Sequence, residues 1–260
     1  MIQLAGYQVE ESLFQGQHYG VYRARDQANN RTVVIKTLQS DMPSSSELAR
    51  LKHDYEIGQQ LNDEHILHYL ALHSVEHKLA LISEDFSAIS LQEYLRHKAL
   101  PLTDFLQLAI PLAQALVVIH DHNIIHKDIK PGNILIQPDT QLIKVSDFGL
   151  ASNLPHEMQQ VVNPEQLEGT LGYISPEQTG RMNRTIDYRS DFYSLGITYY
   201  QMLTGKLPFS SDDAMELLHC HIATPPVPPL EVNPDISDSV SELIMILLAK
   251  NAEDRYQSAR

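Results

Sequence analysis

Four polar residues in the middle of the chain have the types and the spacing that phosphoryl transfer requires. Asp128, Lys130 and Asn133 lie in the run His-Lys-Asp-Ile-Lys-Pro-Gly-Asn at 126–133, and Asp147 begins a later Asp-Phe-Gly. This chemistry needs a carboxylate to accept the proton of a substrate hydroxyl, a cation near the moving phosphoryl group, and oxygen ligands for magnesium. We assign the first role to Asp128 and the second to Lys130. Asn133 and Asp147 are the assigned metal ligands.

The run at 126–133 could by itself be a polar turn. Its asparagine, five residues after Asp128, and the Asp-Phe-Gly that follows make that interpretation weak. With both motifs the chain resembles a protein kinase catalytic domain from about Tyr7 to its last residue. The resemblance implies an α+β, bilobal fold: a small β-rich N-lobe with one helix at 1–86, and a larger helical C-lobe at 87–260.

Hydrophobic spacing indicates elements in the same order. Short β-prone segments and one apolar-periodic helix fill the first third of the chain, and the pattern beyond it is helical. We expect strands near 7–9, 21–24, 32–36 and 79–82, and helices near 44–61, 91–97 and 102–122. Residues 83–86 would connect the lobes.

Lys36 closes the predicted strand at 33–35. A lysine in this position is more often a solvated edge residue, but here it precedes a helix that bears acids, as the phosphate-binding lysine of kinases does. The family pairs that lysine with a carboxylate of the helix. Counting back without gaps favours Asp54, whose side chain is one methylene shorter than the family's glutamate. Glu56 lies two residues further, would face elsewhere on the helix, and remains the alternative.

The loop that covers the ATP phosphates in kinases is poor in glycine here. Gly16 is the only glycine in its expected place, and Phe14 and Tyr19 stand where two others would be. Glycine lets backbone amides approach phosphates closely, so this departure puts nucleotide affinity in doubt. The resemblance implies ATP and Mg2+ as cofactors, with the nucleotide in the cleft between the lobes. The predicted nucleotide-binding residues are Lys36, Asp54, Gly16, Val21, Glu84, Phe86, Asn133 and Asp147.

The segment after Asp-Phe-Gly resembles the substrate-binding end of a kinase. Gly-Thr-Leu-Gly-Tyr at 169–173 places Thr170 where the family's threonine contacts the catalytic aspartate and lysine. With Lys130, this threonine implies a preference for serine and threonine hydroxyls. Glu177 and Arg255 resemble a buried structural pair, and Asp191 resembles the aspartate that braces the catalytic loop.

A narrower resemblance lies in Tyr-Ile-Ser-Pro-Glu-Gln-Thr-Gly-Arg-Met-Asn-Arg at 173–184 and in His-Cys-His-Ile-Ala at 219–223. Both are similar to the N-terminal kinase module of large bacterial, notably cyanobacterial, proteins that also carry an ATPase region and a sensor histidine kinase. This implies further domains of a longer polypeptide as partners. The sequence stops at Arg260, where a kinase domain would still have part of its last helix, so we expect it to be truncated within the last helix of the C-lobe.

Composition fits a cytoplasmic enzyme. The net charge of −14 disfavours a general nucleic-acid or anionic-membrane surface. A single cysteine, Cys220, excludes an intramolecular disulfide framework. The N-terminal residues do not suggest a signal peptide, and we expect no window that approaches the ~20 apolar residues of a membrane span.

Two functions of different classes remain to be weighed. The first is ATP- and magnesium-dependent phosphorylation of serine or threonine on a protein substrate. The second is a pseudokinase-like module that senses nucleotide or binds a partner without phosphotransfer, supported by the glycine-poor loop. The complete set of charged and amide residues favours the enzyme.

His219, Cys220 and His221 are adjacent, which is poor zinc geometry on a helix, so we interpret them as part of a packed helix.

Overall fold

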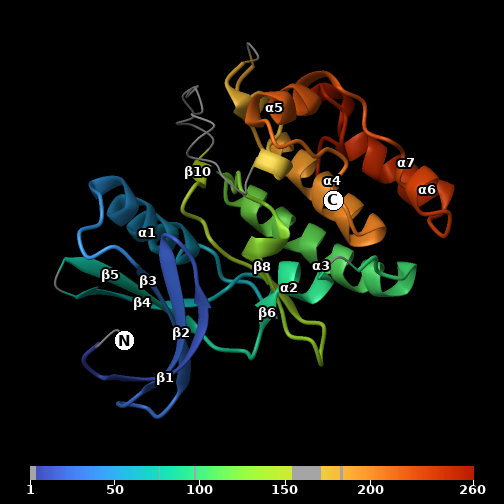
Figure 1. Ribbon diagram of the computed structural model, residues 1–260. Coiled ribbons are helices and arrows are strands. Elements are labelled where there is room, and N and C mark those ends of the chain that lie inside the picture. The colour runs from blue at the N-terminus through green and yellow to red at the C-terminus, as the bar shows by residue number, and fades with distance from the viewer. Residues whose placement is uncertain (1–3, 76, 97, 154–170, 182–183) are drawn as a thin grey trace. The chain divides into compact units, whose positions relative to one another are not determined.

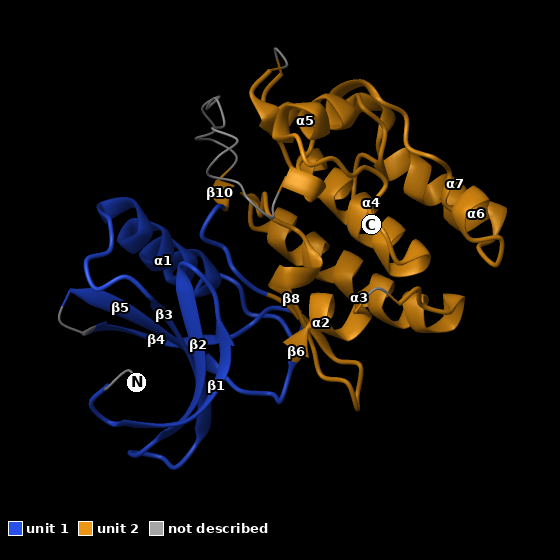
Figure 2. Ribbon diagram, viewed as in Figure 1, with its two compact units in different colours: residues 1–88, 146–150 blue, residues 89–145, 151–260 orange. Residues whose placement is uncertain are grey.

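The chain divides after Ala88, and a short later segment joins the part that precedes this point. The computed structural model describes residues 4–75, 77–96, 98–153, 171–181 and 184–260. Its first unit comprises Met1–Ala88 and Ser146–Leu150, and its second unit comprises Ile89–Val145 and Ala151–Arg260 (Figure 2). This division falls two residues beyond the predicted boundary at 86 and assigns the Asp-Phe-Gly segment to the first unit.

A five-stranded antiparallel sheet forms the first unit, in the order β1-β2-β3-β5-β4 (Figure 1). Its strands are β1 (Tyr7–Gln15), β2 (Tyr19–Asp26), β3 (Thr32–Leu38), β4 (Tyr69–Val75) and β5 (Lys78–Glu84). Side chains alternate between the faces of a strand, so the buried Val33 and Ile35 lie on one face of β3 and Lys36 lies on the other. Of the five strands in this sheet, all except β4 were predicted at least in part.

One helix, α1 (Ser45–Gly58), follows β3 in the chain and contacts β4 and β5. Ser44 caps it: its hydroxyl accepts the N–H of Glu47, and the Glu47 carboxylate accepts the N–H of Ser44. This capping box satisfies two N–H groups that a helix start leaves unpaired. The buried residues of α1 are Leu51, Asp54, Ile57 and Gly58. The spacing of Leu51, Asp54 and Ile57 puts a carboxylate on the buried face of the helix.

Helices dominate the second unit. They are α2 (Leu91–Leu95), α3 (Leu102–Asp121), α4 (Arg189–Thr204), α5 (Ala214–Ala223), α6 (Pro229–Val232) and α7 (Asp238–Leu247). One small sheet contains β6 (Ile89–Ser90), β8 (Ile134–Ile136) and β9 (Ile143–Val145), and another contains β7 (Ile124–Ile125) and β10 (Ser152–Asn153). The α4 helix is buried along most of its length and contacts α3, α6 and α7. A β-sheet region followed by a helical region confirms the predicted α+β class.

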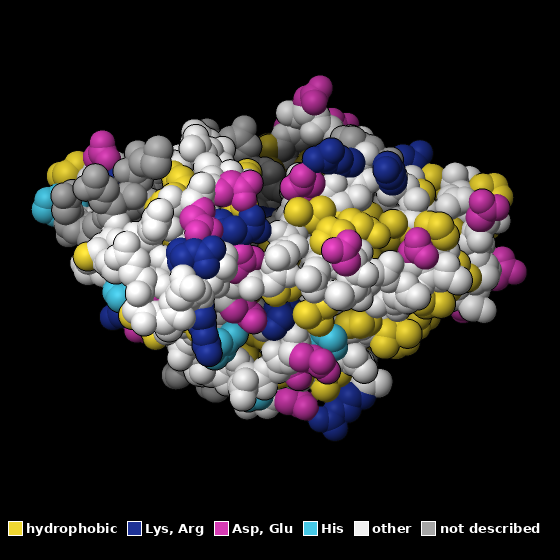
Figure 3. All heavy atoms as spheres, turned by 90° about the horizontal axis from the view of Figure 1, so that it is seen from below, with side chains coloured by type: hydrophobic (Ala, Val, Ile, Leu, Met, Phe, Trp, Pro, Cys, Tyr) yellow, Lys and Arg dark blue, Asp and Glu magenta, His cyan; other side chains and the backbone are white. Residues whose placement is uncertain are grey.

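The apolar helix α3 corrects one expectation. Its 20 residues include an 18-residue window of mean hydropathy 1.8, so by length and composition alone it could span a membrane. Its buried residues are Phe105, Leu108, Ala109, Leu112, Ala115, Leu116 and Ile119. These positions recur at helical spacing, and α3 contacts α4, β7 and β9 within its unit. Core packing therefore accounts for the apolar composition. Leu106 and Ile110 of α3 stay exposed, and Figure 3 shows apolar side chains gathered on a face of the helical unit.

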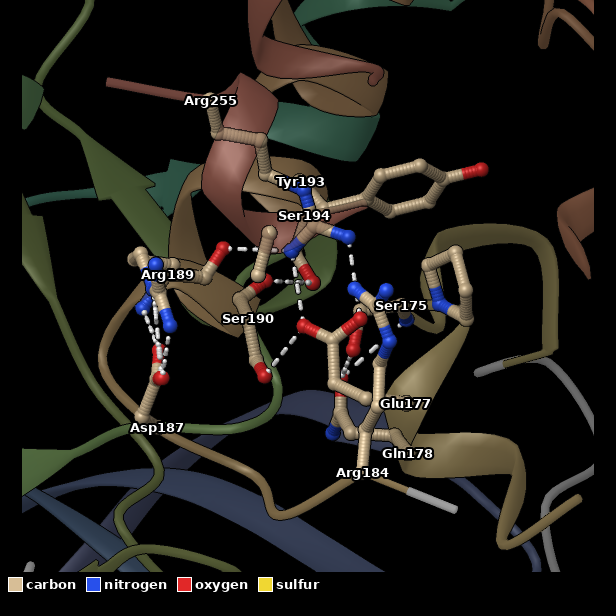
Figure 4. Close-up of polar contacts among 12 residues, drawn as sticks. Ser175, Glu177, Gln178, Arg184, Asp187, Arg189, Ser190, Tyr193, Ser194 and Arg255 are labelled. Atoms are coloured by element: carbon tan, nitrogen blue, oxygen red, sulfur yellow. Dashed lines mark hydrogen bonds and ion pairs between the residues drawn. The ribbon is translucent and has the colours of Figure 1, made fainter. Parts of the chain in front are cut away.

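A buried ion pair fixes the end of the second unit. Arg255 donates from both terminal nitrogens to Glu177, at 2.7 and 2.9 Å, and Ser190 donates to the same carboxylate at 2.6 Å (Figure 4). Arg255 also donates to the carbonyl of Arg189 at 2.8 Å. Burial opposes ionisation of Glu177, but the hydrogen bonds from Arg255 and Ser190 outweigh it and hold the pKa of that carboxyl below its ordinary value. This confirms the predicted pair.

Removing Arg255 should destabilise the second unit strongly, because it leaves an ionised Glu177 without its buried counterion. We expect Arg255→Met to lower the free energy of unfolding by about 3–5 kcal/mol. The matched control is Arg184→Met, which breaks an exposed pair with Glu253 (2.7 Å) and should cost less than about 1 kcal/mol. Urea unfolding followed by circular dichroism measures both. Equal costs would contradict the structural role of the buried pair.

His221 should make stability depend on pH. Its Nδ1 lies 3.0 Å from the Tyr193 hydroxyl, and burial, with the charge of Lys250, lowers the pKa of His221 from 6.5 to about 3. Between these values the unfolded chain binds a proton that the folded protein does not, so unfolding becomes easier as pH falls. From pH 6.5 to 5 this amounts to about 2 kcal/mol.

We therefore expect His221→Gln to reduce the loss of stability between pH 6.5 and 5, where carboxylates titrate little. Denaturant unfolding at several pH values would measure it. His219→Gln is the control, since His219 lies on the same helix and is exposed. A wild-type slope in the His221 variant would contradict this assignment.

Candidate functional site

Asp128 is held in place by two neighbours in the second unit. Lys130 Nζ lies 2.9 and 2.8 Å from the two carboxylate oxygens of Asp128. Asn133, at the end of the short turn η1 (Pro131–Asn133), donates from Nδ2 to the Asp128 carbonyl at 2.9 Å and to its Oδ2 at 2.8 Å. The structure thus brings together three of the residues predicted from the sequence. Asp128 is 3% exposed, so its orientation is fixed by these contacts.

The backbone before Asp128 is held by a buried carboxylate on α4. Asp191 accepts the N–H groups of His126 and Lys127, at 2.9 and 2.8 Å, and its Oδ2 lies 2.9 Å from His120 Nε2. Burial opposes ionisation of Asp191, but His120 and the backbone N–H groups outweigh it and lower its pKa. The predicted bracing role of Asp191 is confirmed.

Gln178 also holds the backbone before Asp128, by its contact with Lys127. This role of Gln178 was not predicted from the sequence. Its Nε2 donates to the carbonyl of Lys127 at 2.8 Å, and its Oε1 accepts the N–H and the hydroxyl of Ser175, at 3.1 and 2.9 Å (Figure 4 shows Gln178 and Ser175). Lys127 has a φ of +67°, a left-handed conformation that costs a non-glycine residue about 1–2 kcal/mol. Fixing both the N–H and the carbonyl of Lys127 keeps the peptide that leads into Asp128 in this conformation.

Lys36 in the first unit contacts two carboxylates. Its Nζ lies 3.1 Å from Asp54 Oδ2 and 3.2 Å from Asp147 Oδ1. Burial would lower the pKa of Lys36, but Asp147 and Asp54 outweigh it and raise the pKa, so the ammonium stays charged. Glu56, the alternative partner, lies 3.5 Å from Lys52 on the exposed side of the helix. The structure therefore pairs Lys36 with Asp54.

The second oxygen of Asp54 reaches the Asp-Phe-Gly backbone. Asp54 Oδ1 accepts the hydroxyl of Tyr69 at 2.7 Å and the N–H of Phe148 at 2.8 Å. The same Tyr69 oxygen accepts the N–H of Asp147 at 3.1 Å. Burial, then the charges of Asp54 and Asp147, raise the pKa of Tyr69 well above its ordinary value, so it remains a donor. Tyr69 was not singled out from the sequence.

The glycine-poor turn places an aromatic ring beside Lys36. Lys36 Nζ lies 4.8 Å from the centre of the Tyr19 ring, within the range of a cation–π contact. Gly16 begins the turn, and its N–H donates to the Tyr19 carbonyl at 2.9 Å. A side chain at Gly16 would meet the Phe14 ring. Val21 follows on β2, opposite Lys36 in the strand register.

The remaining predicted residues lie at the end of the first unit or outside the described chain. Glu84 is the last residue of β5, and its carboxylate accepts the N–H of His68 at 3.0 Å. Phe86 is half-buried. Between them, Asp85 accepts Arg23 Nε at 2.6 Å and the N–H of Ser87 at 2.8 Å. Thr170 lies outside the described residues.

Comparison with known proteins gives one consistent answer. A family model of the protein kinase domain matches residues 7–260. A probable serine/threonine-protein kinase of Clostridium perfringens is 31% identical over 256 residues, 98% of this chain and 37% of that relative. The serine/threonine-protein kinase PknB of Mycolicibacterium smegmatis is 32% identical and that of Mycobacterium tuberculosis 31%, each over 97% of this chain and 41% of the relative. The chain thus spans about two fifths of the length of these curated relatives.

Asp54 and Glu56 allow a matched test of the Lys36 pairing. Asp54→Asn removes one of the two carboxylates that Lys36 contacts, so we expect kcat/KM for ATP to fall about tenfold or more, which is a loss of at least ~1.4 kcal/mol. Glu56→Gln removes a carboxylate two residues away that contacts Lys52, and should leave kcat/KM near the wild-type value. Steady-state phosphotransfer at varied ATP measures both. Similar losses in the two variants would contradict the assignment.

Proposed function

The chain belongs to the protein kinase family, and from this premise we propose that it transfers the γ-phosphoryl group of ATP to serine or threonine hydroxyls of a protein substrate in bacterial signalling. The observation that carries the proposal is the Asp128 carboxylate held by Lys130 and Asn133. The names of the bacterial relatives, which are serine/threonine-protein kinases, support the substrate class.

Asp128 and Lys130 have complementary roles in this reaction. A carboxylate whose direction is fixed by two donors can accept the proton of a substrate hydroxyl and orient its oxygen. Lys130, at 2.8 Å from that carboxylate, brings a positive charge that can also stabilise the transferring phosphoryl group. Thr170 is proposed to contact both, as the family resemblance implies.

Lys36 and Asp54 are proposed to hold the phosphates of ATP from the first unit. Asp54 fixes the position of the Lys36 ammonium at 3.1 Å, and that ammonium can pair with phosphate oxygens. Gly16 and Val21 are proposed to lie near the phosphates and the base, and Glu84 and Phe86 near the adenine.

The donor atoms of Asp147 and Asn133 fit magnesium. Mg2+ prefers oxygen ligands, and usually takes one or two carboxylates and completes its shell with substrate phosphates and water. Asp147 offers a carboxylate, and Asn133 uses its amide nitrogen to hold Asp128, so its amide oxygen is the proposed ligand atom. Magnesium, when bound, supplies charge neutralisation at the phosphates. Among the described residues no group of three or more His, Cys, Asp or Glu side chains is arranged to hold a metal ion, and a phosphate-bound magnesium does not require one.

The alternative, a non-catalytic module that senses nucleotide, does not require this arrangement. Such a module needs no carboxylate oriented by a lysine and an amide, as Asp128 is. We also propose further domains of a longer polypeptide, from the sequence resemblance, and a cytoplasmic location, from the composition and the single cysteine.

Neutralising either Asp128 or the proposed metal ligand Asp147 should slow transfer strongly without unfolding the protein. We expect Asp147→Asn and Asp128→Asn to lower turnover at least about a hundredfold, because oriented charge in a transition state is worth several kcal/mol. Radiolabelled ATP with generic protein substrates measures transfer, and circular dichroism checks the fold. Asp139→Asn, in an exposed turn, is the control. Wild-type protein that binds ATP but transfers no phosphate would favour the non-catalytic module.

A further inference from the structure

We propose that Tyr69 is a positioning residue for the Asp-Phe-Gly segment, and that its hydroxyl, admitted by the missing side chain of Gly58, sets the orientation of Asp147. The inference rests on the proposed function, since it assigns Tyr69 a part in placing a residue of the phosphotransfer site. It concerns only residues of the first unit.

The Tyr69 hydroxyl is the shared partner of two groups that must be aligned. It donates to Asp54 Oδ1 at 2.7 Å and accepts the N–H of Asp147 at 3.1 Å. A hydroxyl can donate and accept at once, whereas a phenylalanine in this place could do neither. The side chain comes from the first residue of β4 and is buried, with 3% exposed. Both hydrogen bonds of the Tyr69 hydroxyl are made to protein groups.

Gly58 makes room for the ring. A Cβ atom on Gly58, the last residue of α1, would come closer than 3.0 Å to Tyr69 Cδ2 and Cε2. Any side chain there would therefore displace a buried aromatic ring. Glycine destabilises a helix by about 1 kcal/mol relative to alanine. At position 58 the close approach of the Tyr69 ring explains the glycine, and an unusual backbone angle does not.

Two successive peptide N–H groups are fixed by this arrangement. The N–H of Asp147 goes to Tyr69, and the N–H of Phe148 goes to Asp54 at 2.8 Å. Asp147 has a φ of +68°, a left-handed conformation that costs residues with a side chain free energy, although aspartate tolerates it better than most. Because these N–H groups flank the Asp147 side chain, they set the direction of the carboxylate that contacts Lys36 at 3.2 Å.

Tyr69→Phe removes the hydroxyl and keeps the ring. We expect amide hydrogen exchange of the peptide covering 146–150, measured without nucleotide, to become roughly ten- to a hundredfold faster, the equivalent of one hydrogen bond to a charged group. We expect the single-turnover rate of phosphotransfer to fall by a similar factor. Tyr7→Phe is the control, since the Tyr7 hydroxyl lies 3.3 Å from His73 Nε2 in the same sheet, away from Asp147.

A second pair of variants separates packing from hydrogen bonding. Gly58→Ala should destabilise the unit by overlap with the ring, and Gly58→Ala combined with Tyr69→Leu should relieve that overlap. The double variant should therefore regain thermal stability while its exchange and transfer rates stay like those of Tyr69→Phe. Wild-type rates in the double variant or in Tyr69→Phe would overturn the proposal. Exchange that became faster throughout the first unit, and not specifically at 146–150, would also overturn the proposal. It would show that Tyr69 acts by packing in the unit and not by its hydrogen bonds to the Asp-Phe-Gly segment.

Failure of the proposed function gives a different result. A wild-type protein without phosphotransfer would refute the kinase activity, yet the exchange experiment needs neither nucleotide nor substrate. It would still show whether the Tyr69 hydroxyl fixes the segment.

Discussion

Three buried carboxylates organise the described parts of the chain. A charge inside a protein is tolerated only where counterions and hydrogen bonds replace water. Asp54, Asp191 and Glu177 are all buried, and each gathers donors from distant parts of the chain. Asp54 joins β3, β4, α1 and the Asp-Phe-Gly segment; Asp191 holds the backbone before Asp128; Glu177 binds Arg255 near the end of the chain. The residues assigned to phosphotransfer are therefore placed by buried acids that hold the backbone and side chains around them.

Both acids predicted to act in phosphotransfer adjoin left-handed backbone. Lys127, before Asp128, has a φ of +67°, and Asp147 itself has a φ of +68°. Such residues persist where surrounding contacts outweigh their cost. Asp191 and Gln178 hold Lys127, and Tyr69 and Asp54 hold the peptides beside Asp147. Buried side chains thus specify two backbone conformations that the local sequence disfavours.

The sequence predicted the fold class, four strands of the first sheet, helices α1, α2 and α3, and the positions of the charged residues, because these lie in short motifs or follow hydrophobic periodicity. It did not predict the contacts of Tyr69 with Asp147 or of Gln178 with Lys127, because no motif or resemblance assigned a role to Tyr69 or Gln178. The Glu177–Arg255 pair, equally distant in the chain, was predicted because the family resemblance pointed to it. Helical phase did favour Asp54 over Glu56, because the buried face of α1 repeats at three to four residues. One signal was available and unused: Gly58 interrupts that buried face, which indicates that another group approaches closely. The expectation that no window approaches a membrane span was wrong for α3, since a core helix can have the same length and apolar composition as a membrane span.

The glycine-poor turn and two carboxylates surround the same group, the ammonium of Lys36. Lys36 Nζ donates a hydrogen bond to Asp54 at 3.1 Å and forms an ion pair with Asp147 at 3.2 Å. The Tyr19 ring lies over the same nitrogen, in a place where the family has a glycine. A phosphate oxygen that binds Lys36 must therefore share this ammonium with Asp54 and Asp147 or displace one of them. The net charge of −14 adds no general attraction for a nucleotide. In the function that we propose, affinity for ATP would then come from local groups, Lys36 and the proposed magnesium ligands first among them, more than from backbone amides of the turn.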